Sequence, residues 1–81
     1  MYSRKNMSVI AFANGFTLWH YGTTEDTAVT IAEPNYFKDD AVLMAVGDKI
    51  LVCAKDGFIE LVVVKLGNNM CWTKVLQKAE F

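Results

Sequence analysis

The chain has 81 residues, of which 53% are hydrophobic and 21% charged, and its formal net charge is −1. This length allows one domain with one core, and the composition excludes intrinsic disorder, which requires low hydrophobicity and high net charge. A folded chain of this size exposes on the order of 5,000 Å², so its interior is too small to enclose all of its hydrophobic residues. The excess favours a homo-oligomer or a stable complex with another protein.

The charge balance and the hydropathy argue against two classes of partner. Eight Lys and Arg stand against nine Asp and Glu, whereas proteins that bind nucleic acids usually carry a basic excess. The longest strongly apolar stretch, residues 61–64, is far shorter than the roughly 18 residues that cross a membrane. We therefore expect neither a nucleic acid nor a membrane as partner.

Residues suited to catalysis or metal binding are few. Cys53 and Cys71 have only His20 as a further soft ligand, so they do not make a zinc site. Because no secretion signal is recognised, both thiols are expected to be reduced and buried. His20 lacks a nucleophile in its own motif, and the acidic pairs 25–26 and 39–40 lack the ligand spacing of an EF-hand. We expect no enzyme activity, no catalytic or metal-binding residues and no cofactor.

The first part of the chain predicts an arm and a β-hairpin. Residues 1–6 are polar and predict a flexible N-terminal arm, which leaves a single small β domain over residues 7–81. Two β-rich runs, 9–13 and 16–21, flank the pair Asn14-Gly15. Both residues of that pair tolerate positive φ, which favours a two-residue hairpin turn.

The middle of the chain predicts one strand and one short helical segment. Residues 27–32 alternate in a way that is typical of a strand, and Pro34 ends it because proline cannot donate to a sheet. Residues 36–46 show approximately helical spacing of apolar side chains. Asn35 is placed to cap this helix and Gly47 to end it.

The last part of the chain predicts three further strands, at residues 49–54, 58–66 and 70–76. Turn-forming residues separate them, Asp56-Gly57 first and then the segment 67–69. Short strands joined by hairpin turns are typical of small antiparallel folds. The expected fold is therefore mostly β, a small antiparallel β-barrel or sandwich with one helical segment at about 36–46.

Several short motifs follow one another in a recognisable order. They are Leu-Trp-His-Tyr at 18–21, Thr-Thr-Glu-Asp at 23–26, Asn-Tyr-Phe at 35–37, Leu-Met-Ala-Val-Gly-Asp-Lys-Ile at 43–50 and Asp-Gly at 56–57. The pattern resembles a group of small tailed-bacteriophage and prophage proteins, among which are head decoration, head-fibre and spike-base modules. This resemblance covers residues 14 to about 64. It implies a virion structural protein, made in the host cytoplasm and incorporated into the virion.

The resemblance and the apolar composition together predict that the protein acts by binding to other proteins of the virion. The expected partners are further copies of the chain and the major capsid protein or another virion protein, and a trimer would suit the local three-fold sites of a capsid. Large aromatic side chains provide contact area at low entropic cost. The residues predicted to take part are Trp19, Tyr21, Tyr36, Phe37, Phe58 and Trp72.

An alternative function is a small β-barrel binding module for a nucleic acid or protein ligand. Aromatic side chains can stack on single-stranded nucleic acid or sugar, but such platforms are normally interleaved with Lys and Arg. Here the aromatic residues neighbour Glu25, Asp39 and Asp40. Packing in the core or at a protein interface is therefore favoured over a stacking platform.

Overall fold

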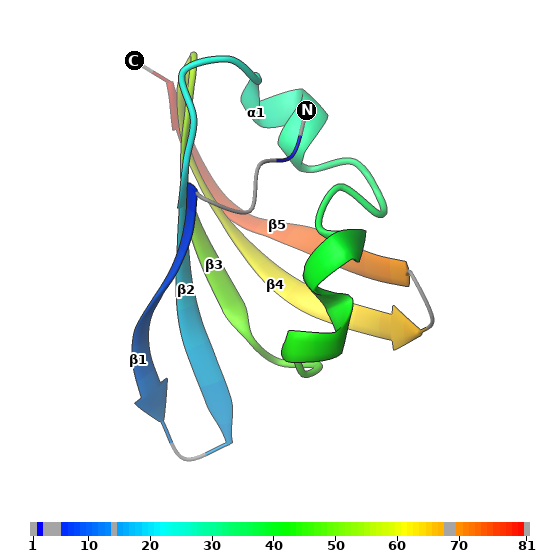
Figure 1. The fold of residues 1–81 in the computed structure, drawn as a ribbon. Helices are drawn as coiled ribbons and strands as arrows, with labels where there is room; N and C mark the ends of the chain where they lie inside the picture. The colour runs from blue at the N-terminus through cyan, green and yellow to red at the C-terminus, as the bar shows by residue number, and fades with distance from the viewer. Residues whose placement is uncertain (1, 3–5, 14, 68–69, 81) are drawn as a thin grey trace.

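The computed structural model describes residues 2, 6–13, 15–67 and 70–80. Within these residues the chain forms five strands and two short helices (Figure 1). In chain order they are β1 (Met7–Ala13), β2 (Phe16–Gly22), α1 (Ala28–Ile31), the 3₁₀ helix η2 (Lys38–Leu43), β3 (Lys49–Ala54), β4 (Gly57–Gly67) and β5 (Met70–Glu80).

The strands make one curved sheet in the order β1-β2-β3-β4-β5. The expected mostly-β fold is confirmed, and three of its four strand pairs are antiparallel as expected, while β2 and β3 run parallel. A parallel pair needs a long crossover connection, and residues 23–48 supply it with both helices. The strands described leave β1 and β5 at opposite edges, so the sheet is not closed into a barrel.

The hairpins expected at three places all form. β1 pairs with β2, β3 with β4 and β4 with β5, each antiparallel. Gly15 has a φ of 97°, the positive value expected of a residue in the first turn. Asn14, Asn68 and Asn69, which were also assigned to turns, lie outside the described residues.

The strand expected over residues 27–32 is wrong, because α1 occupies that place. Thr27 caps the helix, and its Oγ1 accepts a hydrogen bond from the Thr30 backbone N–H at 3.4 Å. The Ala28 N–H donates to Asp56 Oδ1 at 2.9 Å. Ile31 enters the core while Val29 stays exposed. A threonine cap and an external carboxylate thus satisfy the backbone donors that open the helix.

The second helical segment is shorter and tighter than expected. It is the 3₁₀ helix η2, which begins at Lys38 and ends at Leu43, rather than a helix over 36–46. Asp39 and Asp40 lie in its first turn. Gly47, with a φ of 99°, begins the turn into β3.

Asn35 does not cap this helix, contrary to expectation. The residue before η2 is Phe37, and it makes no capping bond through its side chain. Asn35 has a positive φ of 68° and instead binds the start of β5. Its N–H donates to the Cys71 carbonyl at 2.8 Å, and its Oδ1 accepts from the Cys71 N–H at 3.0 Å. These two bonds use the outward-facing peptide groups of β5 at that point.

The core lies on the face of the sheet that α1 and η2 cover (Figure 1). Register places Trp19, Ile50 and Leu61 side by side on β2, β3 and β4. Tyr2, in the segment expected to be a flexible arm, packs against this core. The buried hydrophobic residues are Trp19, Tyr21, Ile31, Phe37, Ala41, Met44, Ile50, Val52, Ala54, Ile59, Leu61, Val63 and Cys71.

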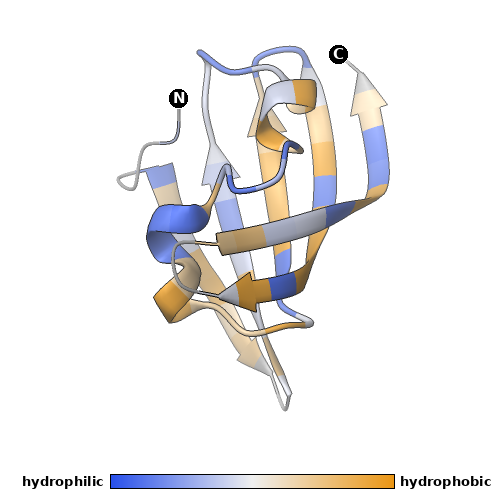
Figure 2. Cartoon of the chain, turned by 90° about the vertical axis from the view of Figure 1, so that its right-hand side faces the viewer, coloured by the Kyte–Doolittle hydropathy of each residue, from blue (hydrophilic) through white to orange (hydrophobic). Residues whose placement is uncertain are grey.

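The total accessible surface is 4993 Å², which agrees with the expectation from chain length. Twelve large hydrophobic side chains of the described residues remain exposed. Figure 2 shows hydrophobic residues along the strands and at the end of η2. None of the described helices has the length and hydrophobicity needed to cross a membrane.

Candidate functional site

Three of the six aromatic residues predicted to contact a partner lie in the core. Trp19, Tyr21 and Phe37 are buried within the chain itself. Tyr21 and Phe37 belong to a group of four rings, with Tyr2 and Tyr36, in which every pair lies within 5.8 Å between centroids. Five of these six ring pairs are edge-to-face, an arrangement that stabilises aromatic packing. Their role in this structure is to hold η2 and the crossover connection on the sheet.

The hydroxyls of the three tyrosines in this group all make hydrogen bonds within the chain. Tyr2 donates a hydrogen bond to Asp40 Oδ2, and Tyr36 donates one to Asp26 Oδ2. The hydroxyls of Tyr21 and Tyr36 lie 3.0 Å apart. Burial, together with the hydrogen bonds to Asp26 and Tyr21, raises the pKa of Tyr36 far above its usual value of 10.0. Burial also raises the pKa of Asp40. These groups are constrained as structural donors and acceptors rather than presented to a ligand.

Trp19 is held by a carboxylate that sequence reasoning did not single out. Asp48 is 2% exposed. Its Oδ2 accepts from Trp19 Nε1 at 3.1 Å and from the Ala45 N–H at 3.0 Å, and its Oδ1 accepts from the Thr17 N–H at 2.9 Å. One buried side chain therefore fastens the segment after η2 to the first residues of β2. The sequence analysis includes Asp48 only in the motif at 43–50, after Gly47 at the expected end of the helical segment.

The remaining predicted aromatic residues lie on strands β4 and β5 and in the crossover. Trp72 is 43% exposed, and the Lys65 ammonium lies 5.2 Å from the centre of its ring. Phe58 and Tyr36 are half-buried. Of the six, Trp72 is the one that offers a largely open ring to a partner.

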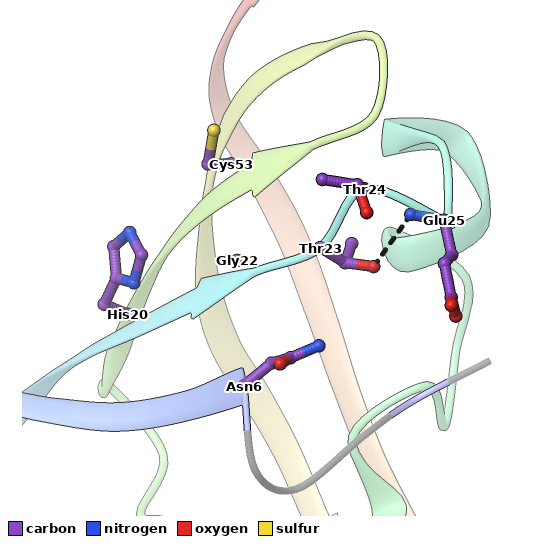
Figure 3. Close-up of a pocket in the computed structure, with 7 residues that line it drawn as sticks. All are labelled: Asn6, His20, Gly22, Thr23, Thr24, Glu25 and Cys53. Carbon is purple, nitrogen blue, oxygen red and sulfur yellow. Dashed lines mark hydrogen bonds between the residues drawn. The ribbon is translucent and has the colours of Figure 1, made fainter.

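A hollow of about 660 Å³ opens near the carboxyl ends of the parallel strands β2 and β3. His20, Cys53 and Glu25 are its titratable residues, and Asn6, Thr23 and Thr24 also line it (Figure 3). The Glu25 N–H donates to Thr23 Oγ1 at 3.1 Å. Figure 3 shows the His20 and Cys53 side chains directed away from Glu25. A nucleophile, a base and an acid therefore do not converge in this hollow.

The cysteines differ from the expectation in one respect. Both are free thiols, and Cys71 is buried as predicted, but Cys53 is exposed because it faces away from the helices at the end of β3. Burial raises the pKa of Cys71 to about 11. Among the residues that the structure describes, no three His, Cys, Asp or Glu side chains are grouped to hold a metal ion.

The exposed hydrophobic residues form two features that sequence reasoning missed. The first follows the hairpin of β1 and β2, where Val9, Ile10, Phe12 and Phe16 are exposed, Phe12 to 81%. The second follows η2 and the segment after it, where the exposed side chains are Val42, at 86%, with Leu43 and Val46. In residues 42–46 only Met44 is buried, and the four hydrophobic residues around it are exposed.

The two features lie next to each other. Phe12 stands opposite Thr17 in the hairpin, and Thr17 and Ala45 bind the same carboxylate, that of Asp48. Val46 follows Ala45 directly. The tip of the hairpin and the end of the crossover thus present one apolar surface, which we call the hairpin surface and define as Val9, Ile10, Phe12, Val42, Leu43 and Val46. Phe16 pairs with Ala13 and lies near Lys49 on the face of the sheet that the helices leave uncovered.

A smaller groove of about 240 Å³ lies between α1 and the ends of β4 and β5. Its apolar lining comes from Ala28, Val29, Ala32, Ile59 and Val75, and Glu33 and Lys78 stand at its borders. Its lining therefore contains one acidic and one basic residue, and no cluster of either charge. The groove is of a kind that accommodates an apolar side chain of a peptide.

Comparisons with protein-family models, with curated proteins and with solved structures found no match to this chain.

Proposed function

We propose that the protein is a structural subunit of a tailed-phage virion, of the capsid decoration or head-fibre/spike-base kind, which works by self-association and by attachment to the capsid. The observation that carries the adhesive part of this proposal is the hairpin surface. It gathers six of the twelve large hydrophobic side chains that are exposed among the described residues. Contiguous apolar areas of this kind usually mark sites of protein association.

The construction of the hairpin surface supports adhesion by a preformed site. Ala41 and Met44 are buried while Val42, Leu43 and Val46 point outward, so the exposed residues belong to a segment that is anchored from below. Asp48 fixes the same segment to β2. A surface that is already ordered loses little conformational entropy on binding, and more of the burial energy is retained.

Two measurements test the proposal. Sedimentation equilibrium of the purified chain over a roughly hundred-fold range of concentration is expected to show reversible self-association. Immunoblotting of gradient-purified particles, released from a bacterial strain whose prophage carries this sequence, is expected to detect the chain in the particle band. A strictly monomeric chain that stays in the soluble fraction would overturn the proposal.

A second candidate function is a binding module for a protein ligand, and the groove beside α1 favours it. Val29 and Val75 are exposed at that groove, and Lys78 stands beside it. A peptide with one apolar anchor and an acidic neighbour would suit this lining. If the chain is monomeric but Val29→Lys abolishes its capture of a protein from phage particles, the second candidate replaces the first.

A further inference from the structure

The two edges of the sheet differ in chemistry. β5 carries Lys74 and Lys78 along its length, and Asn35 occupies its peptide groups at Cys71. β1 has neither feature. It pairs with β2 on one side, and in the part of the chain that the structure describes no backbone group pairs with its other side.

The β1 edge lies within a long uncharged stretch. Residues 6–24 contain no Asp, Glu, Lys or Arg, and Val9, Ile10 and Phe12 are exposed on β1. Natural edge strands usually carry charges or proline, because unpaired peptide groups beside apolar side chains recruit another strand. The one irregularity of β1 is a register shift between Val9 and Ala11, and it lies in the ladder with β2. An edge of this composition is suited to being covered.

We propose that β1 pairs antiparallel with β1 of a second copy across a two-fold axis near Ile10. This inference rests on the proposed self-association and names the surface that carries it. Pairing centred on Ile10 sets Val9 opposite Ala11 and Ser8 opposite Phe12 of the other copy, so no charge enters the interface. The two sheets become one continuous sheet with β5 at both ends.

Charge decides between this pairing and its rivals. If β1 paired with β5 of the second copy, Lys74 and Lys78 would lie among Val9, Ile10 and Phe12, where a lysine loses hydration without an acidic partner. If β5 paired with β5 around Leu76, Lys74 would stand opposite Lys78, and like charges in cross-strand positions are destabilising. The uncharged β1 is complementary to itself.

The apolar area buried between the two β1 strands sets the expected affinity of the dimer. The exposed parts of Val9, Ile10 and Phe12 on β1 amount to roughly 350 Å² per copy, or about 700 Å² in the pair, before backbone contacts are added. Interfaces that bury about 1,000 Å² are at the small end of specific association and dissociate in the micromolar range. The dimer is therefore expected to be reversible, with Val42, Leu43 and Val46 left free for a further partner.

Sedimentation velocity of matched lysine variants tests the inference. Ile10→Lys and Phe12→Lys each put a charge into the paired edge and are expected to weaken dimerisation at least about ten-fold, because each must bury or displace an unpaired ammonium. Val64→Lys adds the same charge at an exposed apolar residue on β4, outside the hairpin surface, and Leu76→Lys adds it on the opposite edge. Both controls are expected to leave the dissociation constant within about two-fold. Circular dichroism verifies that each variant is folded.

A cross-linking experiment gives an independent positive readout. Ile10→Cys in a Cys53→Ser chain places two thiols next to the two-fold axis, where opposed residues of an antiparallel pair are about 5 Å apart. Mild oxidation is expected to yield a disulfide-linked dimer, whereas Val64→Cys in the same chain is expected to stay monomeric under denaturing electrophoresis.

The outcomes separate the inference from the function on which it rests. If the native chain associates but the β1 variants associate equally well and Ile10→Cys does not cross-link, the inference is overturned and the adhesive function stands. Loss of the dimer with Leu76→Lys alone would assign the interface to β5 and also overturn it. A native chain that is monomeric yet present in particles would overturn pairing with a second copy. In that case β1 either pairs with a different virion protein or pairs with none. A chain that is monomeric and absent from particles overturns both proposals.

Discussion

Replacing Asp48 by alanine is expected to destabilise the fold more than any other loss of one carboxylate. The side chain is 2% exposed and accepts three hydrogen bonds, from the backbone of Thr17 and Ala45 and from Trp19 Nε1. The Trp19 bond is buried, and a buried donor left without a partner costs about 1–3 kcal/mol. The Thr17 and Ala45 bonds are part-buried, so water offsets part of their loss. We therefore expect Asp48→Ala to lower the free energy of unfolding by about 4 kcal/mol.

This loss is large for so small a domain. At roughly 0.05–0.15 kcal/mol per residue, a chain of this length has a total stability of about 4–12 kcal/mol. Asp48→Asn should cost less, about 2 kcal/mol, because its one carbonyl oxygen still accepts from the Trp19 and Ala45 donors while its amide faces the Thr17 N–H.

Urea denaturation followed by tryptophan fluorescence measures the effect, since Trp19 lies in the core beside the altered group. Glu25→Ala, which removes an exposed carboxylate, is the matched control and should change the unfolding free energy by less than about 0.5 kcal/mol. If Asp48→Ala unfolds within about 1 kcal/mol of the native chain, the three bonds do not hold the crossover to the sheet and our account of the hairpin surface is wrong.

Two further predictions concern groups whose pKa is raised. Because burial raises the pKa of Cys71 to about 11 while Cys53 is exposed, a thiol reagent at pH 8 should modify one thiol per native chain, and none in Cys53→Ser until urea is added; rapid modification of two thiols in the native chain would contradict the structure. The raised pKa of Tyr36 means that its neutral form is favoured by folding, so its contribution to stability is fully present below the unfolded value of 10.0 and is lost as the pH rises above it. Tyr36→Phe should therefore flatten the fall in unfolding free energy between pH 9 and about 11, and an unchanged slope would refute this assignment.

Local turn chemistry was the part of the fold that the sequence predicted best. Asn14-Gly15 and Asp56-Gly57 each marked a hairpin, and Gly15 has the positive φ expected of such a turn. The second turn lies one residue earlier, at Lys55 and Asp56, and Gly57 belongs to β4 without a positive φ. The parallel pairing of β2 with β3 depends instead on where the crossover connection returns to the sheet, which no local pattern encodes. The prediction of a strand at 27–32 was wrong for a related reason. The alternation of its residues suits a strand, but the Thr27 cap and the hydrogen bond from the Ala28 N–H to Asp56 favour a helix.

The aromatic residues show where sequence reasoning about the site stopped. Their size marked Tyr21 and Phe37 as important, but size is equally compatible with a core and with an interface. The structure places both rings inside because Tyr2 and Tyr36 surround them. Phe12 and Val42 drew no attention as single residues, and they matter only because Asp48 brings the segments that carry them together.

The burial of the aromatic group explains why the apolar surface lies elsewhere. Four rings and the side chains of Ala41 and Met44 lie beneath η2, while Val42, Leu43 and Val46 are exposed. Reversing the segment to hide these three would expose Met44 and release the Ala45 bond to Asp48. The apolar exterior is therefore a consequence of how the core is filled, and its shape is fixed before any partner arrives. A partner that covers it gains burial energy without first having to order the chain.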